Sequence, residues 1–378
     1  FVTAGVAIRK FWTDDGFARE VRLRADLVTA QLKSLSSLVP GSRLKGRGMM
    51  QGLDVRSGEL ADAITSPAKL LAMLDLDPAL ADAAIAAGAG FQLRVPHAFV
   101  RRMRRGDPRD PLLRQILPLA AELTTAPGFV ADPLAEQASI TAPALLHKYQ
   151  GRALIITTGA CAVHCRYCFR REFPYADQAH DNPRQTLALA AIAADPTITE
   201  VLLSGGDPLS LSDQRLSALT TTLDAIAHVE RIRVHTRQPI VLPARVDTGL
   251  LRWIASVRKP LVIVLHTNHA NEIDDEVCSA IQKLRQPHVT LLNQAVLLAG
   301  VNDSVDALAE LSQKLFRCGV LPYYLHLLDQ VRGTAHFDVC QSRAEELVGL
   351  LAARMPGYLV PRLAREVPGQ PAKVTLAP

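Results

Sequence analysis

The second half of the chain alternates short apolar runs with longer amphipathic segments. The runs are rich in Leu, Ile and Val and cover 153–157, 200–204, 231–235, 261–266, 289–296 and 321–327. Segments with helical spacing, such as 211–227 and 303–318, lie between them. After the first pair, the runs start about every thirty residues, the length of one βα unit. This pattern predicts an α/β fold with a partial (β/α)6 barrel, although periodicity alone also allows a doubly wound open sheet.

Each apolar run becomes polar where it ends. In parallel barrels the carboxyl ends of the strands carry the chemistry, so this distribution favours a barrel with its site at one mouth. The polar ends are Thr157 with Thr158, Ser204 to Asp207, His235 to Arg237, His266 to His269, Asn293 with Gln294, and His326 to Asp329.

The first 150 residues have a different pattern. Apolar positions recur at helical spacing from 60 to 101, and the stretch 79–87 is rich in Ala. The stretch 21–38 is also amphipathic. We expect an N-terminal extension of unknown role at 1–58, a helical region at 59–150, the barrel core at 151–345 and a C-terminal segment at 346–378.

Composition and charge narrow the class of protein. Of 378 residues, 48% are hydrophobic and 21% are charged, which suits a large buried core. No apolar run reaches the roughly 18–20 residues of a membrane helix, and no short apolar run follows a basic N-terminus. We therefore expect a cytoplasmic protein without a membrane partner. The net charge is +5, and the basic run 101–105 is more typical of a solvated helix face than of a nucleic-acid site.

The most specific motif is a group of three cysteines within eight residues, Cys161, Cys165 and Cys168. Three thiolates on a short loop can ligate three corners of a [4Fe–4S] cluster and leave the fourth iron open to a small molecule. Structural zinc usually takes two CxxC-type pairs, whereas this CxxxCxxC motif has no second pair nearby. A zinc site completed by His164 is therefore disfavoured.

The remaining cysteines, Cys278, Cys318 and Cys340, are widely separated. We interpret them as small buried apolar residues and not as a disulfide framework, and the thiols indicate a reducing compartment.

A Gly-Gly-Asp-Pro turn follows the second apolar run. Paired glycines permit close approach of the backbone to a ligand, so Gly205, Gly206 and Asp207 are candidates to cradle whatever binds the open iron. The same sequence is also an ordinary turn, and its position one βα unit after the cysteines makes the binding interpretation stronger.

The cysteine motif and this turn together resemble the radical S-adenosylmethionine (SAM) superfamily. Within it, CRYCFRR at 165–171, NHANEI at 268–273, LNQAVLL at 292–298 and GVND at 300–303 resemble lysine 2,3-aminomutases, from about residue 60 to the C-terminus. Four further segments are similar to the branch that makes (R)-β-lysine for the modification of translation elongation factor P. They are LLHKY at 145–149, FPYA at 173–176, PYYLH at 322–326 and LVPRLARE at 359–366.

The resemblance implies an isomerase with three cofactors: a [4Fe–4S] cluster, SAM and pyridoxal 5′-phosphate (PLP). Reductive cleavage of SAM would supply a 5′-deoxyadenosyl radical that takes hydrogen from the β-carbon of lysine, and PLP would carry the migrating nitrogen from Cα to Cβ. The partners implied are lysine, an electron donor such as flavodoxin or ferredoxin, and elongation factor P with its lysyl-transferring ligase. The resemblance leaves room for a homo-oligomer.

The resemblance also implies the site residues. Lys373 matches the lysine that binds PLP, and the C-terminal segment is therefore expected to bind this cofactor. Arg170 would bind the substrate carboxylate, and Asp329 and Glu366 its side-chain ammonium. The expected PLP phosphate ligands are Lys148, Tyr149 and Arg152, and the expected SAM ligands are Gly205, Gly206, Asp207, His266 and Gln294.

Three other functions stay open from the sequence. They are a 2,3-aminomutase acting on another amino acid such as glutamate, a catabolic lysine 2,3-aminomutase, and a non-catalytic iron–sulfur or zinc module. A glutamate enzyme should carry a cation where this chain has Asp329.

Overall fold

The computed structural model describes residues 26–27, 29–31, 33–34, 43–47, 50–54, 62–175 and 182–376. The chain divides into two compact units, Phe1–Asp62 and Ala63–Pro378, close to the boundary expected at 58. In the first unit, β1 (Arg43–Arg47) pairs antiparallel with β2 (Met50–Asp54). Most of the amphipathic stretch at 21–38 lies outside the described residues.

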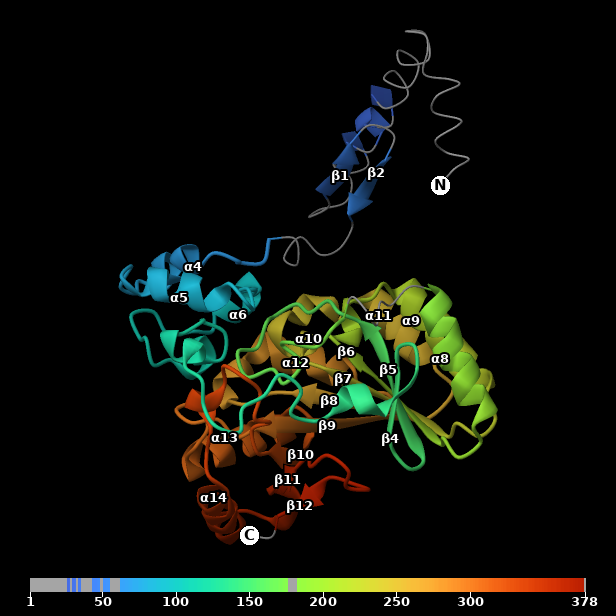
Figure 1. The fold of residues 1–378 in the computed structure, drawn as a ribbon. Coiled ribbons are helices and arrows are strands. Elements are labelled where there is room, and N and C mark those ends of the chain that lie inside the picture. The colour runs from blue at the N-terminus through green and yellow to red at the C-terminus, as the bar shows by residue number, and fades with distance from the viewer. Residues whose placement is uncertain are drawn as a thin grey trace. The chain divides into compact units, whose positions relative to one another are not determined.

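A ten-stranded sheet organises the second unit (Figure 1), with the strand order β12-β11-β10-β9-β8-β7-β6-β5-β4-β3. The strands β5 to β11 are parallel, whereas β3, β4 and β12 pair antiparallel at the two edges. The sheet is therefore an open, partial barrel. The strands are β3 (Ile140–Ala142), β4 (Leu145–Tyr149), β5 (Arg152–Thr158), β6 (Glu200–Gly205), β7 (Arg231–Thr236), β8 (Leu261–His266), β9 (Val289–Val296), β10 (Leu321–His326), β11 (Arg362–Arg365) and β12 (Val374–Thr375).

Helices connect the parallel strands. They are α8 (Asn182–Ala194), α9 (Asp213–Ala225), α10 (Gln238–Val241), α11 (Thr248–Ser256), α12 (Asp275–Lys283), α13 (Val305–Arg317) and α14 (Gln341–Arg354). Four others precede the sheet: α4 (Pro67–Met73), α5 (Leu80–Gly88), α6 (His97–Val100) and α7 (Pro111–Arg114). The 3-10 turns are η1 (Ala120–Leu123), η2 (Glu136–Ser139), η3 (Pro208–Ser210), η4 (Pro243–Arg245), η5 (Ala270–Glu272), η6 (Ala335–Phe337) and η7 (Gly357–Leu359).

The connecting helices begin at side-chain caps and bury one face against the sheet. Ser212, Asp247, Asp274 and Ser304 each accept a backbone N–H of the first turn of α9, α11, α12 and α13, which satisfies a donor that has no partner inside the helix. The apolar faces of these helices join alternate strand residues, such as Ile232 and Val234 of β7, in one core. The other strand residues face away from this core and line the opposite face of the sheet.

The sequence located the parallel strands well. All six apolar runs form strands of the parallel sheet, and the segments 211–227 and 303–318 contain α9 and α13. The helical region expected at 59–150 ends differently, because residues 140–149 form β3 and β4, which pair with each other, and β4 also pairs with β5. Pairing with β5 satisfies the backbone of an edge that the sequence pattern could not reveal.

Two further expectations were wrong. Cys278 of α12 and Cys318, the C-cap of α13, form a disulfide, and Cys340 is exposed. The three cysteines are therefore not free thiols buried in the core. The two bonded residues lie 40 positions apart and meet because their helices follow neighbouring strands. Cys161, Cys165, Cys168 and Cys340 are free thiols.

The basic run 101–105 is also not a uniformly solvated helix face. It follows the end of α6, and Arg102 is buried, donating to the carbonyl groups of Ala98 and Glu272. Arg101, Arg104 and Arg105 are exposed as expected. Among the described residues, no helix has both the length and the hydropathy needed to cross a bilayer.

Candidate active site

The inner face of the sheet, opposite the helix-packed core, is unusually polar. In β7, Ile232 and Val234 are buried, while Arg233 and His235, which alternate with them, are only partly buried. Burial and the positive charges of Arg233, Lys373 and Arg170 lower the pKa of His235, so residues from distant parts of the chain surround one space. Most of the expected site residues face this space or its rim.

The cysteine motif forms the loop that leaves β5. Cys161, Cys165 and Cys168 are each partly buried, and the backbone N–H of Cys168 donates to the carbonyl of Cys165 at 3.1 Å. Burial raises the pKa of Cys161, and it raises that of Cys168 to about 11, with neighbouring motif cysteines adding to both shifts. The motif cysteines are thus near enough to influence one another's ionisation. Among the described residues, no three His, Cys, Asp or Glu side chains converge as ligands of one metal ion.

Glu122, which was not expected from the sequence, anchors this loop through two of its arginines. Its carboxylate accepts from Arg166 Nε and Nη2 at 2.9 and 2.6 Å and from Arg171 Nη2 at 2.7 Å. The Glu122 and Arg166 side chains are 1% and 0% exposed. Two arginines of the CRYCFRR segment are therefore structural anchors of the cysteine loop.

The Gly-Gly-Asp-Pro turn packs directly against the cysteine loop. Gly205 has φ +117°, and a Cβ on Gly206 would lie 2.4 Å from the carbonyl oxygen of Ala160. Both glycines are therefore required for close approach of two backbone segments. The expected SAM cradle thus has a packing role that the sequence analysis did not foresee.

Asp207 has a different role from a free ligand group. Its carboxylate accepts from Thr236 Oγ1 at 2.7 Å and from the backbone N–H groups of Leu209, Arg237 and Gln238 at 3.0, 2.8 and 3.1 Å. With these donors in place, Asp207 ties the end of β6 to the end of β7. Its expected contact with SAM stays a prediction beside this positioning role.

The other two expected SAM residues lie on neighbouring strands. His266 and Gln294 are register partners of β8 and β9. His266 Nε2 lies 2.7 Å from the Tyr167 hydroxyl, and burial and the charge of Arg237 lower its pKa to about 3. His266 is therefore a neutral side chain that connects the sheet to the cysteine loop, and Gln294 is partly buried beside it.

Lys373, the expected PLP lysine, belongs to a group of three charged residues. Lys373 Nζ lies 2.7 Å from Glu366 Oε2, and Lys148 Nζ lies 2.7 Å from Glu366 Oε1. Burial disfavours ionisation of Glu366, but the charge of Lys373 and the hydrogen bonds from both lysines lower its pKa. In this structure Glu366 is thus a bridge between two lysines.

Asp329 lies beside this bridge and is perturbed in the opposite direction. Burial and the negative charge of Glu366 raise its pKa to about 7. A cation brought into this space would favour the ionised form of Asp329, because its own neighbours do not fully compensate the charge.

The expected phosphate ligands include donors with no partner in the protein. Among the described residues, Arg152 Nε and Arg233 Nε are buried and make no hydrogen bond, while burial and the neighbouring Glu366 carboxylate raise the pKa of Tyr149. The Arg152 guanidinium lies over the Tyr149 ring, 4.7 Å from its centroid. Orphaned buried donors are costly, so these groups fit an anionic ligand such as a phosphate. Arg233 was not expected from the sequence.

Arg170, the expected carboxylate ligand, is already held by Glu136. Arg170 Nε and Nη2 donate to the two Glu136 oxygens at 2.7 Å each, and Nη1 donates to Ser204 Oγ at 3.0 Å. The pair is buried, with 7% and 9% of the two side chains exposed. Glu136 was missed by the sequence analysis because it precedes the barrel, and no motif marks it.

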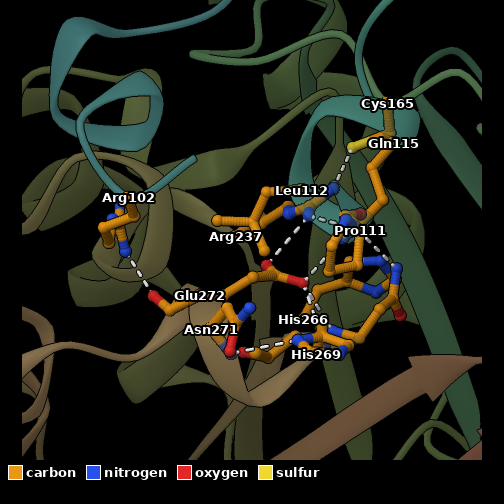
Figure 2. Close-up of polar contacts among 12 residues, drawn as sticks. Arg102, Pro111, Leu112, Gln115, Cys165, Arg237, His266, His269, Asn271 and Glu272 are labelled. Carbon is orange, nitrogen blue, oxygen red and sulfur yellow. Dashed lines mark hydrogen bonds and ion pairs between the residues drawn. The ribbon is translucent and has the colours of Figure 1, made fainter. Parts of the chain in front are cut away.

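A fully buried network, also missed, connects the cysteine loop to the strand ends. Arg237 contacts Cys165, Tyr167, Gln115 and Glu272 (Figure 2). The one available signal was position, because Arg237 and Glu272 stand at or just past polar strand ends and a buried charge there requires partners.

Comparisons with known proteins place this site in a class. Residues 155–312, from β5 into α13, match the family described as Radical SAM superfamily. The cysteine loop and the turn after β6 lie inside this match, so the fold and the site define a radical SAM protein.

The particular family follows from full-length relatives. The chain is 48% identical over 322 residues to the L-lysine 2,3-aminomutase of Escherichia coli K12, covering 84% of this chain and 93% of the relative. It is 46% identical to the Haemophilus influenzae protein of the same name, covering 84% and 94%. A Clostridium subterminale protein of that name is 38% identical, covering 72% of this chain and 65% of its own length.

The chain therefore belongs to the L-lysine 2,3-aminomutase family and is a radical SAM isomerase. This membership confirms the expected cofactors, which are the [4Fe–4S] cluster, SAM and PLP.

Proposed function

We propose that the protein converts α-lysine to (R)-β-lysine in the cytoplasm and that the product serves the modification of elongation factor P. The observation that carries the substrate assignment is the acidic pair Asp329 and Glu366 beside Lys373. The printed name of the relatives supports lysine, and the match to 93% of the E. coli protein supports the shorter branch.

In this proposal each part of the site has a separate task. The three cysteines would hold the cluster to which SAM binds, and Lys373 would hold PLP. When bound, these groups supply a carbon radical and a conjugated carrier for the migrating amine. The unpaired Nε donors of Arg152 and Arg233, together with Lys148 and Tyr149, would hold the PLP phosphate.

The protein's own residues then orient the amino acid. Arg170 is kept in place by Glu136, Ser204 and the Gly205 carbonyl, which leaves one N–H of Nη2 for the carboxylate. Asp329 and Glu366 attract the side-chain ammonium, and its charge stabilises ionised Asp329. His235 and His326, both partly buried, carry no competing positive charge, because desolvation lowers the pKa of each well below its usual value.

The same charges argue against glutamate. Its side-chain carboxylate would meet Asp329, whose charge its neighbours do not fully compensate, whereas Glu366 is already paired with Lys148 and Lys373. Like charges in a low-dielectric space repel each other, so Asp329 favours a cationic amino acid over an anionic one.

The direct test is anaerobic turnover of reconstituted protein with L-lysine, a chemical reductant, SAM and PLP, followed by chiral chromatography. We expect (R)-β-lysine from lysine and no β-amino acid from L-glutamate. Formation of (S)-β-lysine would overturn the branch assignment. Conversion of glutamate in preference to lysine would overturn the substrate assignment. Electron delivery by flavodoxin or ferredoxin and the mass of the assembly can be measured on the same preparation.

A further inference from the structure

One arginine reaches a cysteine of the cluster motif. Arg237 lies directly after β7, and its side chain is 6% exposed. Its Nη1 donates to Cys165 Sγ at 2.8 Å, while Nη2 donates to Gln115 Oε1 at 2.7 Å and to Glu272 Oε2 at 2.9 Å. Figure 2 shows Arg237 between the Cys165 sulfur on one side and the Glu272 carboxylate on the other.

The partners of Arg237 are themselves fixed. Glu272 Oε1 accepts the backbone N–H groups of Asn268 and His269 at 2.9 and 3.1 Å and the amide of Gln115 at 3.1 Å. The Glu272 side chain is 0% exposed. The backbone N–H of Arg237 is held by Asp207 at 2.8 Å. The guanidinium therefore has one orientation, set from both ends.

The contact is specific to one of the three cysteines. Among the described residues, the structure gives Cys165 a charged side-chain donor, whereas Cys168 receives a backbone hydrogen bond from Arg170. Glu272 partly neutralises Arg237, so the positive charge that acts on the Cys165 sulfur is weaker than that of an unpaired arginine. The three prospective cluster ligands therefore have different hydrogen-bond donors.

We propose that Arg237 sets the reduction potential of the cluster through its hydrogen bond to Cys165, with Glu272 as the opposing charge. This inference rests on the proposed function, because it requires the [4Fe–4S] cluster on this loop. Adding an electron makes the cluster more negative, and a cationic N–H donor at a ligand sulfur stabilises that reduced form. Arg237 raises the potential, and Glu272 limits the rise.

The test is a redox titration of reconstituted protein without SAM or substrate, followed by electron paramagnetic resonance of the reduced cluster. For Arg237→Gln we expect the reduction equilibrium to fall about tenfold, a midpoint roughly 59 mV more negative for a one-electron couple. For Glu272→Gln we expect a shift of opposite sign. A purely structural role for the network would not give opposite signs.

Arg102 provides the matched control. Its side chain is also 6% exposed, and it contacts the same network through the carbonyl of Glu272 without reaching a cysteine (Figure 2). Arg102→Gln should leave the midpoint where it is. Arg237→Lys keeps the charge but lacks the guanidinium fork, so its midpoint should lie between those of the wild type and Arg237→Gln.

The outcomes separate the two proposals. Unchanged midpoints in Arg237→Gln and Glu272→Gln, or equal shifts in Arg237→Gln and Arg102→Gln, would overturn the tuning role. If Arg237→Gln does not fold, Arg237→Lys and Glu272→Gln decide the same question. Failure of the wild type to bind four irons would instead refute the cluster site, and the tuning role with it.

Discussion

The site has two regions that differ in how completely the protein satisfies its own polar groups. Around the cysteine loop, Glu122 and Glu272 are buried and each is paired with arginine. Around Lys373, by contrast, Asp329 has a pKa raised to about 7, and Arg152 and Arg233 each have a buried Nε without a partner. The first region also has a buried Nε without a partner, on Arg237, but its carboxylates are paired, whereas the Asp329 carboxyl of the second region is not fully compensated.

This difference indicates a division of labour. Buried ion pairs with several hydrogen bonds hold their members in one geometry, which suits a loop that positions a metal cluster. Unsatisfied donors and a perturbed carboxyl cost stability and are retained where a ligand completes them. Substitutions in the first region should therefore affect folding, and those in the second should affect binding and turnover.

The largest expected effect is on turnover, from Lys373→Ala in the second region. Loss of the PLP lysine should reduce β-lysine formation by about a thousandfold or more. Glu366 keeps Lys148 as a partner, so the midpoint of thermal unfolding should change little. The measurements are anaerobic product formation and a melting curve for each variant. Lys283→Ala, at an exposed position of α12, is the control. Retained turnover would remove Lys373 from the proposed site.

Next is the stability of the first region, probed by Glu122→Ala. Removing this carboxylate leaves Arg166 and Arg171 buried without it, and we expect a loss of about 3–5 kcal/mol in the free energy of unfolding. Glu346→Ala, which breaks an exposed pair with Arg343, should cost at most about 0.5 kcal/mol. Denaturant titration of the two variants checks this. Equal losses would contradict the contrast between the regions.

A smaller effect on turnover is expected from Asp329→Asn. Below pH 7 the wild-type carboxyl is protonated and neutral, so kcat/KM for lysine should rise as the pH increases through about 7. The variant should lose roughly 10- to 100-fold in kcat/KM and should lack this rise. A pH profile of the variant that still follows the wild type would assign the titration to another group.

The same substitution gives a stability test with a defined sign. The folded pKa of Asp329 lies above its usual value of 3.8, so the folded state binds more protons than the unfolded chain between these values. Its contribution to stability therefore decreases as the pH rises from about 4 to about 7. Asp329→Asn should melt at a higher temperature than the wild type at about pH 8, and the gain should vanish near pH 4.

The smallest effect concerns the glycines that bring β6 against the cysteine loop. Gly206→Ala places a Cβ 2.4 Å from a backbone oxygen, and the backbone must shift at a cost of about 1–3 kcal/mol. Gly349→Ala in α14 meets nothing within 4 Å and should stabilise by up to about 1 kcal/mol. Melting curves of the pair distinguish tight packing from a general effect of adding a methyl group.

Local patterns in the sequence were sufficient for the repeating part of the fold and for the cluster motif. The apolar runs became β5 to β10 because a short run of Leu, Ile and Val bounded by polar residues is a property of one segment of the chain alone. The edge strands β3, β4 and β12 were not foreseen, since short strands form only through the pairing that a neighbouring strand offers. The Cys278–Cys318 disulfide was missed for the same reason, because it joins separate helices.

For the candidate site, too, the sequence and the tertiary structure decided different things. The sequence by itself determined which residue types were available: three cysteines on one loop, a glycine pair, and ionisable groups at the strand ends. The tertiary structure alone decided which of them are partners. Glu136 joins Arg170, Glu366 joins Lys148 and Lys373, and Glu272 joins Arg237. Such pairings depend on burial and distance across the fold, and charge interactions gain their strength only where folding removes the water between them.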